Sequence, residues 1–115
     1  MEHNLAVWLI IKAVNMTATA QAEYKAKARI IKALAHPTRL FIVDELSRGE
    51  RCVCELKDMI GVKMPTVSRH LGVLKSAGIL EDEKRGLQVF YRLRVPCVLN
   101  FFKCVDAVQR NGKCP

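Results

Sequence analysis

Apolar residues recur at helical spacing in five segments of the chain. The last segment shows the pattern most plainly, because Val98, Phe101, Phe102 and Val105 follow the i, i+3, i+4, i+7 spacing of an amphipathic helix. Prolines and glycines, which interrupt helices, separate the segments. The sequence therefore predicts helices over residues 21–35, 37–47, 53–60 and 65–77, and a last helix from residue 96 to about residue 112.

After the fourth predicted helix, apolar residues recur at every second position, which is the spacing of a strand. Leu87, Val89, Tyr91 and Leu93 alternate with polar residues, so we expect a strand with these four side chains on one face. The sequence KRG at residues 84–86 is the predicted tip of a hairpin. This segment is therefore expected to be β-structure in an otherwise helical chain.

Two short helices joined by a tight turn and followed by a basic hairpin are typical of a winged helix-turn-helix. The turn is GVK at residues 61–63. We predict a mainly α fold with a β-hairpin wing, in which residues 20–115 form one DNA-binding and dimerisation domain. Residues 1–19 are predicted to be an N-terminal extension with at most one extra helix. The residues expected to face the core from the helix over 37–47 are Leu40, Val43 and Leu46.

The second helix of this motif has two distinct faces. At about 100° per residue, Val67, Leu71 and Leu74 point to the core, and Arg69 points away, where it can bond guanine or phosphate. His70 lies nearer the core, so we expect it to pack or to contact phosphate rather than to read bases. The predicted DNA-binding residues are Lys63, Thr66, Ser68 and Arg69, with Lys84 and Arg85 at the wing tip.

The charge of the chain agrees with a polyanionic partner. The 115 residues carry a formal net charge of +8, and the pI is about 9.5. The apolar run from Leu5 to Ile11 is too short to span a bilayer, and the acidic Glu2 precedes it where a signal peptide has basic residues. We therefore expect a cytoplasmic protein with double-stranded DNA, and no membrane, as its partner.

The chain has five cysteines, an odd number that argues against a fully paired disulfide framework. Cys52 and Cys54 lie at the predicted start of the helix over 53–60. In a regular helix their side chains would point about 200° apart, so gripping one ion would mean opening the first helical turn. The nearby Arg51 and the helix N-terminus are expected to lower the thiol pKa values.

Four stretches together resemble one protein family: ALAHPTRLFIVDEL, RCVCEL, PTVSRHLGVLKSAGIL and GLQVFYRL. They are similar to the ArsR/SmtB family of bacterial metal- and metalloid-responsive repressors. The resemblance implies a homodimeric winged-helix repressor that binds a palindromic operator and leaves it when an ion binds. It also implies that the protein is not an enzyme.

The CVC sequence resembles the thiolate site of the arsenic and antimony sensors in this family. The third cysteine of that site is replaced here by Lys57, which cannot bind a cation, so a third sulfur must come from elsewhere. Cys104 and Cys114 could supply it across the dimer, because ten residues of straight helix hold them about 15 Å apart in one chain. The predicted metal ligands are therefore Cys52, Cys54, Cys104 and Cys114, and the inducer is trivalent antimony or arsenic.

Other ligands and another mechanism stay open. Cys97 stands where zinc-sensing relatives have a histidine, but Val95, Val108 and Asn111 replace their remaining ligands, so a zinc site of that type is not expected. Sulfur also suits Cd(II) and Pb(II). Alternatively, the same thiols form a redox switch, in which oxidation to a disulfide releases the operator.

Overall fold

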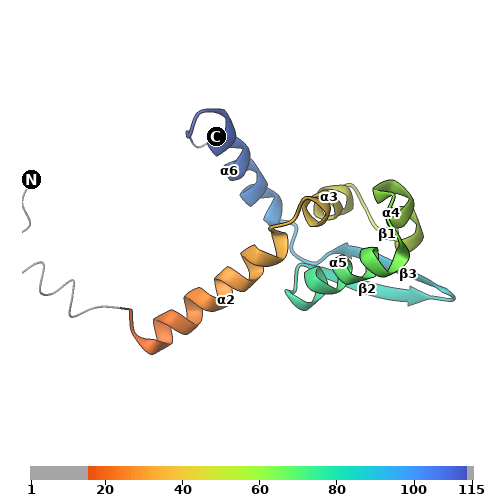
Figure 1. Ribbon diagram of the computed structural model, residues 1–115, viewed down its shortest axis with the longest axis horizontal. Coiled ribbons are helices and arrows are strands. Elements are labelled where there is room, and N and C mark those ends of the chain that lie inside the picture. Colours follow the sequence, from red (N-terminus) through yellow and green to blue (C-terminus); the bar gives the residue numbers. More distant parts are fainter. Residues whose placement is uncertain (1–15, 114–115) are drawn as a thin grey trace, which may run out of the picture.

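The computed structural model describes residues 16–113. Residues 1–15 of the extension predicted over residues 1–19, together with Cys114 and Pro115, lie outside this range. Figure 1 shows a winged helix-turn-helix, so the predicted fold class is confirmed. None of the helices within residues 16–113 is long and apolar enough to cross a membrane. The elements are α2 (Ala18–Leu34), α3 (Pro37–Leu46), β1 (Arg51–Cys52), α4 (Val53–Ile60), α5 (Met64–Ser76), β2 (Leu80–Arg85), β3 (Gln88–Leu93) and α6 (Val98–Arg110).

The wing is a three-stranded antiparallel sheet in the order β1-β3-β2. The short strand β1 was not expected from the sequence. Gly86 and Leu87 form the turn between β2 and β3, and Gly86 has φ 64°, a value that favours glycine. The expectation that Leu87 belongs to the strand is wrong: β3 begins at Gln88, and Leu87 lies in the turn, where it is 100% exposed.

The core lies where α3, α4 and α5 meet the sheet. Leu40 was expected to face it, but the side chain is 39% exposed and lines a groove beside α6. At about 100° per residue, the buried Ile42, Val43 and Leu46 define the inner face of α3, and Leu40 falls on its flank. The largest fully buried side chains are Ile42, Val43, Leu56, Val67, Leu71, Leu74 and Leu80.

Helices α2 and α6 project from this core (Figure 1). Of the 17 residues of α2 only Ala33 and Leu34 are buried, and of α6 only Ala107. Together with α3, these helices border a groove of about 770 Å³. Its main apolar residues are Ile31, Leu34, Leu40, Phe41, Leu99, Phe101, Phe102 and Val105. The described chain thus leaves a large apolar surface on the side opposite the wing.

A polar contact fixes the end of α2 against α5. Arg39 donates from Nε to the carbonyl oxygen of Ala33 at 2.6 Å and from Nη1 to Nδ1 of His70 at 3.3 Å. The His70 ring lies 4.4 Å from that of His36, which caps α3 by accepting the N–H of Thr38. Burial lowers the pKa of His70, and the neighbouring His36, Arg39 and Arg69 lower it further. His70 therefore packs as a neutral ring, as expected.

Replacing a core residue of α4 should destabilise the fold far more than replacing an exposed one. Leu56→Ala removes a side chain that is 0% exposed, and we expect the free energy of unfolding to fall by about 2–5 kcal/mol. Met59→Ala on the same helix is the control, because Met59 is 45% exposed; its effect should stay within about 0.5 kcal/mol. Urea denaturation followed by circular dichroism at one protein concentration measures both, and equal losses would contradict the packing described.

Candidate functional site

The outer face of α5 carries exposed polar side chains. Val67, Leu71 and Leu74 are all 0% exposed, which confirms the predicted register of this helix. Ser68 and Arg69 are exposed, and Thr66 is half-buried beside them. Within residues 16–113 no hydrogen bond or ion pair engages the Arg69 side chain. Its guanidinium is therefore free to meet a ligand in front of the helix.

Two of the lysines predicted to bind DNA, Lys63 and Lys84, are also exposed. Lys63 is exposed and is the N-cap residue of α5, where its side chain makes no capping hydrogen bond. Lys84 is exposed at the end of β2, and no ion pair within the described part of the chain neutralises it. Both lysines thus offer exposed ammonium groups, Lys63 at the start of α5 and Lys84 near the tip of the wing.

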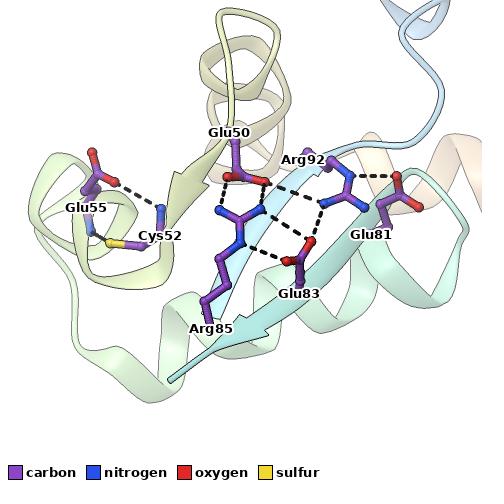
Figure 2. A network of polar contacts seen from close by, with 7 residues as sticks. All are labelled: Glu50, Cys52, Glu55, Glu81, Glu83, Arg85 and Arg92. Atoms are coloured by element: carbon purple, nitrogen blue, oxygen red, sulfur yellow. Dashed lines mark hydrogen bonds and ion pairs between the residues drawn. The ribbon is translucent and has the colours of Figure 1, made fainter. Parts of the chain in front are cut away.

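Arg85, the other cation predicted to bind DNA from the wing tip, takes part in ion pairs. Figure 2 shows its guanidinium between two carboxylates. Its two Nη atoms donate to the Glu50 oxygens at 2.5 and 2.9 Å, and its Nε donates to Glu83 at 2.8 Å. The pKa values of Glu50 and Glu83 are lowered, in both cases mainly by the hydrogen bond from Arg85. The pKa of Arg85 is raised by the same contacts, so the group stays charged and paired.

Arg92 extends this network across the sheet. It donates from Nε to Glu81 at 2.9 Å and from Nη1 to Glu83 at 3.3 Å, and its Nη1 lies 3.5 Å from Glu50. Two guanidiniums therefore share three carboxylates, as Figure 2 shows. Each exposed ion pair contributes little to stability, but the shared network fixes the geometry of the wing.

The sulfur atoms of Cys52 and Cys54 lie 2.7 Å apart. Cys52 ends β1 in an extended conformation (φ −79°, ψ 158°) and precedes α4, whereas Cys54 lies in the first turn of that helix. The expectation that the two side chains point in opposite directions is wrong, because Cys52 is not helical. The pair therefore meets without any opening of the helix.

Cys52 also caps α4. Its sulfur accepts the N–H of Glu55 at 3.4 Å, and its own N–H donates to Oε1 of Glu55 at 3.1 Å (Figure 2). This is a capping box in which sulfur replaces the usual hydroxyl of serine or threonine. Arg51 supports it by ion pairs to Glu55 and Glu45, at 3.2 and 3.1 Å. An acidic residue three positions after Cys52 was the signal in the sequence that could have revealed the cap.

The pKa of Cys52 is raised, and the expected lowering is wrong. The hydrogen bond with Cys54 is the largest cause and burial is the second, since Cys52 is only 4% exposed. Cys54, by contrast, is exposed. Cys52 is therefore a protonated thiol at neutral pH, and any ion that binds it must displace a proton.

Cys97 and Cys104 do not join this pair within one chain. Cys97 precedes α6 and Cys104 lies on it, both are exposed, and Figure 1 shows α6 well away from α4. Cys114 lies outside the described residues. Across residues 16–113 no three His, Cys, Asp or Glu side chains gather in a way that could hold a metal ion. Residues 16–113 of one chain therefore bring two sulfurs to the site.

Comparisons with known proteins agree on one family. Residues 36–82 match the sequence profile of "Bacterial regulatory protein, arsR family". An uncharacterised HTH-type transcriptional regulator of Methanocaldococcus jannaschii is 40% identical over 85 residues, which are 73% of this chain and 96% of that protein. The arsenical resistance operon repressor of Escherichia coli is 47% identical over 66 residues, or 56% of each chain. The chain thus spans a little over half the length of several curated relatives.

The solved structures add agreement in the fold. The homodimeric winged helix-turn-helix DNA-binding domain of Mycobacterium bovis, described as a possible ArsR-family transcriptional regulator, superposes with a TM-score of 0.71. It is 33% identical, and the match covers 84% of this chain and 89% of that domain. The likeness thus includes the helices that flank the core.

The sulfur cap leads to a prediction about stability. Cys52→Ala removes the acceptor for the Glu55 N–H, whereas Cys52→Ser loses the same sulfur but keeps an acceptor. We expect the alanine variant to be about 1 kcal/mol less stable than the serine variant. Urea denaturation of the two under reducing conditions measures the difference, and equal stability would show that the cap has no energetic role.

Proposed function

Because the chain belongs to the ArsR family of bacterial regulatory proteins, we propose that it is a DNA-binding transcriptional repressor. The observation that carries the proposal is the free polar face of α5 beside the wing, on a chain with a formal net charge of +8. In this fold the second helix of the helix-turn-helix enters the major groove. Arg69 would then reach base edges or phosphate, with Thr66 and Ser68 beside it.

Binding as a homodimer would place two such helices on a palindromic operator. The apolar groove between α2, α3 and α6 supports a dimer, since an exposed groove of about 770 Å³ lined by aromatic and aliphatic side chains favours burial against a partner. The two projecting helices border it (Figure 1). A second copy of the chain in the cytoplasm is the partner we propose for this surface.

The inducer we propose is trivalent arsenic or antimony, bound by the thiolates of Cys52 and Cys54. The two sulfurs, 2.7 Å apart, are close enough to bind the same soft trivalent centre after a small separation. The third would come from Cys104 or Cys114 across the dimer, or from a small thiol. A relative named as an arsenical resistance repressor supports this inducer, and Cd(II) and Pb(II) share its preference for sulfur.

Binding at this site would disturb the start of α4. Two sulfurs bound to one ion lie farther apart than the 2.7 Å that separates them here, so Cys52 and Cys54 must move apart when the ion binds. This movement draws the Cys52 sulfur from the Glu55 N–H and weakens the cap. Because Leu56 of α4 is buried in the same core cluster as Leu71 of α5, the displacement reaches the DNA-binding helix. A hundredfold loss of DNA affinity requires a coupling of only about 2.7 kcal/mol.

A redox switch is the second candidate, and the same 2.7 Å distance favours it. Two thiols so close can lose two electrons and two protons to an oxidant such as peroxide and form a disulfide. The new bond would pull the Cys52 sulfur toward Cys54 and away from the cap. The two candidates thus act on one structural element but need different reagents.

The DNA-binding role of α5 predicts a selective effect of Arg69→Ala. We expect a loss of about 1–3 kcal/mol in binding to a preferred duplex, together with weaker sequence preference. The control is Arg110→Ala, which removes an equal charge from the end of α6 and should bind nearly as well as the wild type. Fluorescence anisotropy at several salt concentrations measures both, and equal losses would place DNA binding elsewhere.

The thiol site predicts release by metalloid under reducing conditions. Adding Sb(III) with excess small thiol should weaken duplex binding about a hundredfold in the wild type and leave Cys52→Ser and Cys54→Ser unaffected. Cys97→Ser, which alters a thiol outside the pair, should respond as the wild type does. Release only by peroxide would favour the redox switch. A variant without cysteines that still responds to Sb(III) would refute both candidates.

A further inference from the structure

The hairpin formed by β2 and β3 is bound through side chains to Glu50, just before the thiol pair. Glu50 precedes Cys52 by two residues, and both of its carboxylate oxygens accept from Arg85 at the end of β2. In Arg85 every nitrogen of the guanidinium takes part in a contact with Glu50 or Glu83. This bidentate pair is the shorter of two side-chain connections between Glu50 and the wing hairpin, the other being the 3.5 Å contact with Arg92 (Figure 2).

The backbone makes a second connection at the same place. Cys52 is the register partner of Phe90 in the antiparallel pairing of β1 with β3. The guanidinium of Arg85 lies 4.6 Å from the centre of the Phe90 ring, a cation–π contact. Arg85 therefore lies between Glu50 and Phe90, the residue that pairs with Cys52 in the sheet. A displacement of Cys52 moves both supports of this side chain.

We infer that Glu50 is a positioning residue that couples the state of the Cys52–Cys54 pair to the orientation of the wing. The inference rests on the proposed function, because it names a second route by which that thiol site alters DNA binding. Arg85 serves here as the anchor of the hairpin, and Lys84 is left as the phosphate-contacting cation of the wing. Movement of the cap then changes the distance of Lys84 from the DNA as well as the position of α5.

The charge of the network supports an anchoring role for Arg85. Three carboxylates and two guanidiniums leave a formal excess of one negative charge, so a DNA phosphate gains little by approaching Arg85 and would have to displace Glu50 and Glu83. Lys84, one residue earlier, makes no ion pair among the described residues. Arg85 therefore anchors the hairpin, and Lys84 is available to contact phosphate.

The test compares Glu50→Gln with Glu81→Gln. Both substitutions keep the side-chain size and raise the net charge by one, but Glu81 touches only Arg92, at the other end of the network. The probe is a fluorescent duplex selected by the wild-type protein from a random library, and Kd is measured with and without Sb(III). Sb(III) binding to the thiols is followed separately by the ultraviolet absorbance of the sulfur–antimony bond.

We expect Glu50→Gln to reduce the effect of Sb(III) on DNA affinity without weakening the binding of Sb(III) to the thiols. In Glu50→Gln the ratio of the two Kd values should fall about fivefold relative to the wild type, and the absorbance titration should stay unchanged. Glu81→Gln should keep the wild-type ratio. In DNA-free protein, Sb(III) should shift the amide NMR signals of Gly86 and Val89 in the wild type, and much less in Glu50→Gln.

The outcomes separate this inference from the proposed function. If Sb(III) releases the wild type and Glu50→Gln keeps the full ratio, the coupling role is wrong and the metalloid response stands. If Sb(III) does not release the wild type, the metalloid response is wrong, and the same variants are compared after diamide oxidation of the thiols. If neither Sb(III) nor diamide shifts the NMR signals of the wing in the wild type, the thiol pair is not coupled to the wing and the inference is wrong.

Discussion

The burial of one apolar stripe of α5 against α3, α4 and the sheet is the constraint on which the rest of the molecule depends. Val67, Leu71 and Leu74 have no access to solvent, and they share a cluster with Leu56. This packing turns Arg69 outward. It also places α4, with its sulfur cap, directly against the helix that presents the polar face. The same hydrophobic contact therefore sets the geometry of both candidate sites.

Much of this arrangement could be predicted from the periodicity of the chain. The helices and the hairpin follow from long, regular patterns, and the register of α5 follows from its three buried aliphatic residues. Strand β1 could not be predicted, because two residues carry no period. The geometry of Cys52 was missed for the same reason: a residue at the junction of a strand and a helix obeys neither pattern.

The pairing of Arg85 with Glu50 shows a second limit of sequence reasoning. The two residues are 35 positions apart, and nothing in the composition of the wing tip distinguishes a free cation from a paired one. Only the folded chain brings the carboxylate to the hairpin. A count of basic residues thus overestimates the charge that a wing offers to DNA, and the distribution of carboxylates nearby decides which cations remain available.

The unequal exposure of the two sulfurs gives the pair a form of chemical selectivity. Cys54 is open to solvent, whereas Cys52 is 4% exposed and holds its proton. A reagent that can form only one bond to sulfur meets Cys54 first, because Cys52 is buried. A species with two or more bonds to offer can proceed from the first sulfur to the second, which lies 2.7 Å away and caps α4. The accessible sulfur thus serves as the entry to the buried one, and the valence of the electrophile decides whether the cap itself is bound.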